Sequence, residues 1–209
     1  TDYRDLLSDP HVRLVIVATR HNLHASMATE ALKAGKDVLV EKPLAVDAAQ
    51  ALPVLRRASK LGRKAYVGCV LRFSESLTIF RDLLAGIGPL HSVRIECISY
   101  LPDWQPTRPY LQSFRARPNQ GGVLIDLAHE IDYSGWIFGW PGSLQARVRN
   151  LGRLGIAADE LADLTWETPD GCIVTVNLDF LSRPPQRGVK AHGQQGTIEW
   201  DGLLGKVTV

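Results

Sequence analysis

The sequence contains few cysteines, and their positions fit neither a metal site nor a disulfide framework. Only three of the 209 residues are cysteine, namely Cys69, Cys97 and Cys172, and no two of them form a CxxC pair. A structural zinc or a thioredoxin-like redox site is therefore not expected. We interpret the three as small buried apolar residues of a protein in a reducing, cytoplasmic compartment.

Net charge and long apolar runs are also lacking. The formal net charge is +2, and the cluster nearest to a basic stripe is Arg147, Arg149 and Arg153. Such a cluster is typical of a solvated strand face, so no nucleic-acid partner is expected. No apolar run is long enough to cross a bilayer and no signal peptide is recognisable, so no membrane partner is expected. The 45% of hydrophobic residues allow one or two domain cores.

The first third of the chain alternates apolar strands with helices. We predict buried strands over 11–19, 37–41 and 64–70, joined by helices over 22–34 and 48–61. Asp47 is positioned to cap the second helix and Gly62 to end it, although Pro53 inside removes one helix hydrogen bond. Strand, helix, strand, helix, strand at this spacing predicts a parallel α/β unit.

The pattern changes after Arg72, and we predict two domains, 1–70 and 71–209. The second begins with a helix (75–84), a long strand (91–100), a proline-rich loop (102–118) and an apolar helix (122–138). The remainder predicts antiparallel strands over 143–150, 160–167, 172–181, 188–192 and 197–200, with Asp170-Gly171 turning one hairpin.

The strand CIVTVNLDF, residues 172–180, alternates apolar and polar side chains. This alternation predicts one sheet face covered by helices and one open face. The open face would carry Ile173, Thr175, Asn177, Asp179 and Leu181. We expect it to pair with a second copy of the chain, giving a homo-oligomer.

The stretch VLVEKPLA places a charged pair and a proline where the second strand ends. Ligands of an open parallel sheet bind outside the carboxyl ends of its strands. Those ends carry Thr19, then Glu41-Lys42-Pro43, then the segment 68–72, so Lys42 is expected on the rim of a crevice. Pro43 restricts Lys42 to an extended backbone and permits a cis bond between them. The alternative is a lysine that simply ends a strand in solvent.

A second polar group lies in the apolar stretch GGVLIDLAHEIDYSGWIFG, residues 121–139. Asp126, His129 and Asp132 are spaced by three, which places them on one face of a continuous helix. A carboxylate beside an imidazole favours the charged ring and orients it. With a nearby lysine, such a pair can move a proton to or from a hydroxyl. The alternative is a polar stripe that caps neighbouring loops.

Two histidine patterns supply only part of a metal site. His129-Glu130 begins like HExxH, but Tyr133 occupies the position of the second histidine. His21 and His24 lie three apart without a third ligand. No metal is therefore expected.

Taken together, these stretches resemble the glucose-fructose oxidoreductase and inositol dehydrogenase (Gfo/Idh/MocA) family of NAD(P)-dependent oxidoreductases. Residues 14–45, which include EKP, look like the second half of its Rossmann domain, and residues 121–139 resemble its glycine-led helix with an aspartate and a histidine. QGTIEWDG resembles its late sheet strand. The resemblance covers nearly the whole chain. It implies an α/β plus α+β fold, with the second half of a Rossmann-type parallel sheet followed by a mostly antiparallel open sheet with helices on one face.

The resemblance also implies a cofactor, NAD or NADP, and a substrate that is a sugar, nucleotide sugar or cyclitol. The cofactor side would carry Thr19, His24, Glu41, Lys42 and Pro43. Lys42 would lie beside the nicotinamide and the substrate hydroxyl. His129 would accept the hydroxyl proton, and Asp126 and Arg72 would lie near the substrate.

Three features depart from the family pattern. Arg20 stands where many relatives have proline, and Asp126 stands three residues before His129 rather than four. The third is that no GxGxxG turn occurs, because GIGPLH at Gly86 lacks the last glycine. We therefore expect an internal fragment that by itself binds NAD(H) no better than millimolar. The rival interpretation is an inactive fragment, or a non-catalytic sugar-binding or assembly module.

Overall fold

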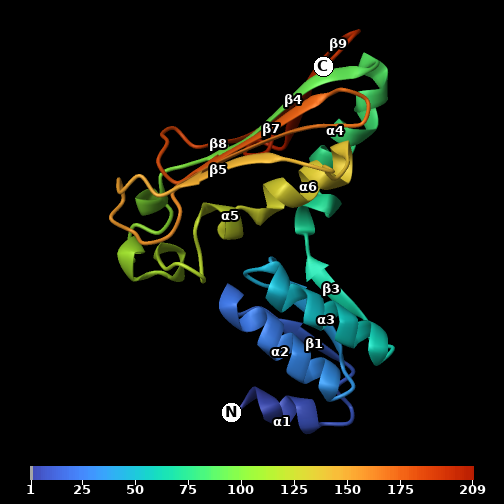
Figure 1. The fold of residues 1–209 in the computed structure, drawn as a ribbon, viewed down its shortest axis with the longest axis vertical. Coiled ribbons are helices and arrows are strands. Elements are labelled where there is room, and N and C mark those ends of the chain that lie inside the picture. Colours follow the sequence, from blue (N-terminus) through green and yellow to red (C-terminus); the bar gives the residue numbers. More distant parts are fainter. Residues whose placement is uncertain (1) are drawn as a thin grey trace. The chain divides into compact units, whose positions relative to one another are not determined.

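The structure is a computed structural model that describes residues 2–209. The chain divides into two compact units, unit 1 over residues 1–69 and unit 2 over residues 70–209. Each unit has its own hydrophobic core. Most elements of both are labelled in Figure 1.

Unit 1 is a parallel sheet with helices. Its elements are α1 (Tyr3–Ser8), β1 (Leu14–Val17), α2 (His21–Lys33), β2 (Asp37–Glu41), α3 (Ala48–Lys60) and β3 (Ala65–Gly68). The described strands pair in parallel in the order β1-β2-β3. The Asp47 side chain accepts a hydrogen bond from the backbone N–H of Gln50 and caps α3, as predicted. The helix continues through Pro53.

The predicted burial of β1 is wrong on one side. Val17 is 2% exposed, but Leu14 and Ile16 remain 49% and 64% exposed. The apolar residues of α2 and α3 pack with Val17, Val38 and Val40 in one core, so only that side of β1 is covered within the described chain. The continuous apolar run in the sequence did not distinguish one covered face from two.

Unit 2 is a large sheet with helices. Its main elements are α4 (Glu75–Leu83), β4 (Leu90–Ile98), α5 (Val123–Asp126), α6 (Ala128–Phe138), β5 (Gln145–Arg149), β6 (Leu161–Glu167), β7 (Ile173–Asp179), β8 (Gln186–Gly193), β9 (Gly196–Asp201) and β10 (Lys206–Thr208). The described strands follow the order β10-β9-β8-β4-β7-β6-β5, and only β4 and β7 pair in parallel. This arrangement confirms the predicted fold class.

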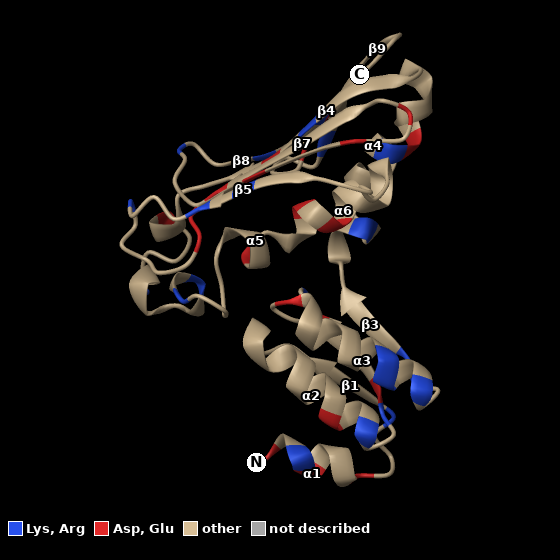
Figure 2. Ribbon diagram, in the orientation of Figure 1, with Lys and Arg blue, Asp and Glu red and all other residues tan. Residues whose placement is uncertain are grey.

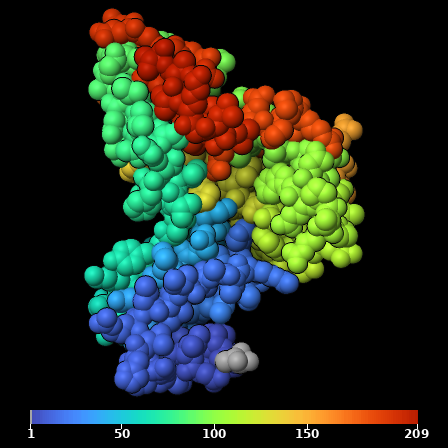
Figure 3. All heavy atoms as spheres, turned by 180° about the vertical axis from the view of Figure 1, so that it is seen from behind, coloured from blue at the N-terminus to red at the C-terminus, as the bar shows by residue number. Residues whose placement is uncertain are grey.

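The alternation in β7 separates two faces of the sheet. Cys172, Val174, Val176, Leu178 and Phe180 are at most 4% exposed and belong to the core. The helix α6 lies along that face (Figure 1). The C-terminal strands lie beside α4 (Figure 3), where the Trp200 indole N–H donates to the Ser76 hydroxyl over 2.9 Å.

The predicted single helix over 122–138 is wrong, because it is broken into α5 and α6 at Leu127. Leu127 has φ −95° and ψ 29°, outside the helical region. Before the break, the backbone of Gly122 at φ 103° sets the entry to α5. There the Asp159 carboxylate accepts from the Leu124 N–H over 3.0 Å. A contact 35 residues away therefore fixes where α5 begins.

Candidate active site

The carboxyl ends of the strands in unit 1 lie next to one another. Val17 pairs with Val40, and Glu41 pairs with Gly68. The residues that follow these strands, including Thr19 and Lys42, are thereby brought to one edge of the sheet. The structure therefore provides the convergence that the sequence predicted for this edge.

His24 joins two of the loops at this edge. Its ring is fully buried, with Nδ1 2.7 Å from the carbonyl oxygen of Pro43 and Nε2 3.1 Å from that of Thr19. Each ring nitrogen is thus within hydrogen-bond distance of one carbonyl oxygen, one after β1 and one after β2. The ring thus acts on the site by holding the backbone after β1 against the backbone after β2.

Lys42 and Glu41 lie on the same edge with more access to solvent. Glu41 is exposed, Lys42 is half-buried, and the peptide bond between Lys42 and Pro43 is cis. Gly68 lies under the Glu41 carboxylate, because a Cβ at position 68 would come within 3.3 Å of Glu41 Oε1. The Glu41 carboxylate therefore lies over Gly68, and the exposed Thr19 and half-buried Lys42 follow the neighbouring strand ends at the same edge.

This donor set fits one end of a dinucleotide. The hydroxyl of Thr19, the carboxylate of Glu41 and the ammonium of Lys42 can donate to or accept from an amide or a ribose. The glycine at 68 allows the Glu41 carboxylate to lie close to the backbone of β3. The residues of unit 1 that the sequence singled out for a cofactor are thus suited to that role.

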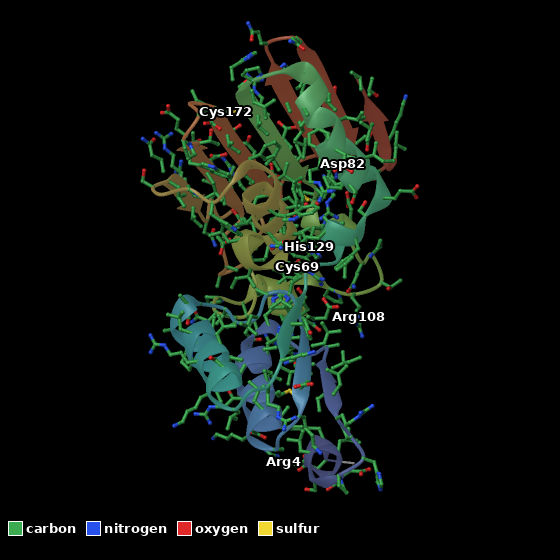
Figure 4. The ribbon with its side chains drawn as sticks, turned by 90° about the vertical axis from the view of Figure 1, so that its right-hand side faces the viewer. Arg4, Cys69, Asp82, Arg108, His129 and Cys172 are labelled. Atoms are coloured by element: carbon green, nitrogen blue, oxygen red, sulfur yellow. The ribbon has the colours of Figure 1, made fainter. Side chains whose placement is uncertain are left out.

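In unit 2, His129 lies near the start of α6 and is half-buried (Figure 4). One turn later, Asp132 forms a bidentate ion pair with Arg72 of the short 3-10 helix Val70–Phe73, with Nη2–Oδ1 at 2.6 Å and Nε–Oδ2 at 2.9 Å. Such forked pairs have a defined geometry. The pair ties the beginning of unit 2 to the helix that carries His129.

Asp126 belongs to α5 and has a partner that the sequence did not suggest. Arg115, from the proline-rich loop, donates from Nε to Asp126 Oδ2 over 2.6 Å, and the Asp126 side chain is 6% exposed. The Arg115 guanidinium also lies over the rings of Trp104 and Phe114. Because α5 ends before α6 begins, the predicted shared helix face of Asp126 and His129 is wrong. No spacing rule in the sequence connects Arg115 to Asp126.

Glu130, next to His129, is fully buried and pairs with Arg187 of β8 over 2.6 Å. The ion pair lies between α6 and the inner face of the sheet. Burial of Tyr133 on the same helix raises its pKa well above the ordinary value, and the Glu130 carboxylate adds to the effect. Glu130 and Tyr133 are thus part of the core under α6, which fixes the helix that presents His129.

The histidines and cysteines give no metal centre. Among residues 2–209, no group of three or more histidine, cysteine or acidic side chains is placed to hold a metal ion. Cys97 and Cys172 are buried as predicted, but Cys69, just after β3, is only partly buried. Across the described chain, no helix combines the length and the apolar character needed to span a bilayer.

Two family models match the chain. Residues 1–69 match the model described as oxidoreductase family, NAD-binding Rossmann fold. Residues 82–199 match the GFO/IDH/MocA C-terminal domain.

Individual oxidoreductases are also similar to the chain in sequence. The chain is 27% identical over 206 residues to 1,5-anhydro-D-fructose reductase of Ensifer adhaerens, which covers 95% of this chain and 60% of that enzyme. It is 30% identical over 151 residues to the NADP(+)-dependent scyllo-inositol 2-dehydrogenase IolW of Bacillus subtilis, covering 70% of this chain and 40% of the relative.

A solved structure also resembles the chain along its whole length. The WlbA dehydrogenase of Bordetella pertussis, crystallised with NADH and UDP-GlcNAcA, superposes with a TM-score of 0.87 at 20% identity, covering 100% of this chain and 61% of that one. The chain thus spans at most about three fifths of these relatives. The matches confirm the resemblance found in the sequence, and the chain belongs to the GFO/IDH/MocA oxidoreductase family.

Proposed function

We propose that the protein containing this chain is an NAD(P)-dependent oxidoreductase that interconverts a secondary alcohol and a carbonyl on a sugar, nucleotide sugar or cyclitol. The observation that carries the proposal is the edge of unit 1, where Thr19, Glu41 and Lys42 follow or end adjacent parallel strands in a chain of this family. The named relatives act on an anhydrosugar and an inositol, and a third was crystallised with a nucleotide sugar.

NAD or NADP would supply the acceptor or donor of a hydride. Thr19 and Glu41 would hold the nicotinamide end of the cofactor by hydrogen bonds. His24 and Pro43 would position the loops that present these groups, since the ring of His24 holds both backbone segments. Lys42 would lie beside the nicotinamide and the reacting hydroxyl.

In unit 2, His129 would accept the proton of the hydroxyl during oxidation and return it during reduction. A positioned acid or base of this kind contributes about a hundredfold to ten-thousandfold in rate. Asp126 and Arg72 would lie near the substrate, where the ion pairs with Arg115 and Asp132 fix their orientation.

The test is to assay the whole protein with sugars, nucleotide sugars and cyclitols in the presence of NAD+ or NADP+. The absorbance of the reduced nicotinamide measures the rate. In the whole protein, Lys42→Ala and His129→Ala should each lower turnover by about a hundredfold or more. Lys206→Ala and His11→Ala serve as controls, because both side chains are exposed and neither belongs to the candidate site. Unchanged turnover in the first two variants would show that their side chains are not catalytic.

We further propose that the open face of the unit 2 sheet pairs with a second copy of the chain. Ile173 is 50% exposed on this face. Some of its polar groups are already engaged within the chain, since Asn177 donates to Asp163 and Asp179 accepts from the turn after β7. An apolar side chain among satisfied polar groups suits a surface that a partner covers.

A further inference from the structure

A groove lined mostly by cations lies in unit 1 between the C-terminal ends of α2 and α3. It encloses about 480 Å³ and is lined by Lys33, Pro53, Arg56, Arg57, Lys60 and Leu61. We call these six residues the basic groove. Blue segments, which mark Lys and Arg, lie at the C-terminal ends of these two helices (Figure 2). Its lining contains four cationic side chains and no carboxylate.

The sequence around the groove is unusually one-sided in charge. Residues 48–74 contain six lysines and arginines and no aspartate or glutamate, although the chain as a whole carries 24 basic and 22 acidic residues. Five of these six residues lie in unit 1, so this segment is the main basic concentration of that unit.

The four cations of the groove have no anionic partner in the part of the chain that the structure describes. Lys33, Arg56, Arg57 and Lys60 take part in none of the ion pairs or side-chain hydrogen bonds formed among residues 2–209. Like charges held together without counter-charges repel one another. The groove is therefore poised to gain free energy from a bound anion.

Helix dipoles explain only part of this arrangement. Lys33 lies in the last turn of α2, and Arg57 and Lys60 lie in the last turn of α3, where a cation is favoured. The dipole acts on each helix separately and does not require the two ends to meet around one cavity. It also does not account for Arg56, which lies before the last turn of α3.

The basic groove is separate from the candidate cofactor edge. That edge lies at the start of α2, near His24, whereas Lys33 is the last of the 13 residues of the helix. At 1.5 Å per residue, the two ends of α2 are about 18 Å apart. A ligand of the groove would therefore bind at the opposite end of unit 1 from the carboxyl ends of its strands.

The shape and chemistry of the groove indicate the class of ligand. Its positive charge is local, because the net charge of the whole chain is only +2, so the field suits a compact anion better than a long polymer. Arginine binds phosphate in a bidentate manner, and lysine adds a point charge. Pro53 and Leu61 supply an apolar floor. We propose that the basic groove binds a small molecule that carries several phosphate groups.

Calorimetric titration of the chain with inorganic tripolyphosphate at low ionic strength tests the proposal. The Arg56→Gln/Arg57→Gln variant should bind at least about tenfold more weakly, since each 1.4 kcal/mol is tenfold in affinity. Lys33→Gln, on the other helix, should weaken binding by about threefold or more and keeps the test open if the double variant folds poorly. Citrate, a polyanion without phosphate, should bind at least about fivefold more weakly than tripolyphosphate.

The matched control is Arg147→Gln/Arg149→Gln on β5, which removes the same charge from an exposed arginine pair in unit 2. Its affinity for tripolyphosphate should stay within twofold of the parent chain. If both double variants bound tripolyphosphate equally weakly, the binding would be due to general charge attraction, and the proposal would be overturned. Absence of binding to the parent chain, or citrate binding as tightly as tripolyphosphate, would overturn it as well.

Discussion

At the scale of single residues, the buried carboxylates of unit 2 accept hydrogen bonds from nearby donors. The Glu160 carboxylate, fully buried, accepts from the backbone N–H groups of Leu151, Arg153 and Leu154 at 2.7–3.2 Å. Tyr133 differs, because its buried hydroxyl has no hydrogen-bond partner among the described residues. Leaving such a group unpaired costs about 1–3 kcal/mol.

We therefore predict that Tyr133→Phe stabilises unit 2 by about 1 kcal/mol. The ring would keep its edge-on contact with Trp200, whose centroid is 5.7 Å away. Unfolding of unit 2 can be followed by tryptophan fluorescence in urea, because all five tryptophans lie in it, at positions 104, 136, 140, 166 and 200. Tyr110→Phe is the matched control with the opposite sign, since the Tyr110 hydroxyl donates to the Leu154 carbonyl over 3.0 Å.

The same tyrosine predicts a pH dependence. Burial raises the pKa of Tyr133 in the folded state well above 10, while the unfolded chain ionises near its ordinary pKa of about 10. Above that pH the unfolded state binds fewer protons than the folded state, so stability falls as pH rises, by up to about 1.4 kcal/mol per pH unit. In Tyr133→Phe this loss should be smaller. A parallel alkaline decline in both proteins would contradict the assignment.

At the scale of elements, the start of α5 depends on two adjacent glycines. A Cβ at Gly121 would lie 2.4 Å from the Cα of Arg115, and one at Gly122 would lie 2.2 Å from Oδ1 of Asp159. These close approaches bring the loop that carries Arg115, and the residue that caps α5, against the helix. The entry to α5 is thus fixed by contacts that allow no side chain.

We predict that Gly122→Ala lowers the free energy of unfolding of unit 2 by about 3 kcal/mol, from overpacking added to backbone strain. Gly139→Ala separates the two contributions. Gly139 also has a positive φ, at 89°, but nothing lies within 4 Å of its Cβ position. Its cost should be about 1–2 kcal/mol, from strain alone. Urea unfolding followed by tryptophan fluorescence measures both, and equal costs would mean that the Asp159 contact adds nothing.

At the scale of the whole molecule, the open sheet face should mediate self-association. We predict a dimer in analytical ultracentrifugation, with Ile173→Lys weakening dimerisation by about tenfold or more, because a charge on a covered surface must be desolvated. Leu6→Lys provides the control, since Leu6 is 53% exposed on α1 of unit 1. A protein that stays monomeric at high concentration would contradict the proposed pairing.

The sequence by itself determined the elements whose signals are local. Asp37–Glu41 was predicted with the bounds that β2 has, and the bounds of α2, α3 and α4 were predicted to within one residue, because caps, glycine stops and apolar periodicity act over a few positions. The alternation over 172–180 identified the buried face of β7 for the same reason. The EKP segment and the glycine-led motif were sufficient to identify the family.

Only the tertiary structure decided how distant segments meet. The helix break at Leu127 is one such feature. The others are contacts between residues 11 to about 80 positions apart, namely the Arg115–Asp126 and Arg72–Asp132 ion pairs and the parallel pairing of β4 with β7. Such contacts depend on which surfaces remain after the local elements form, and no spacing in the chain encodes them. The same holds for the basic groove, where α2 and α3 place cations from two helices around one cavity.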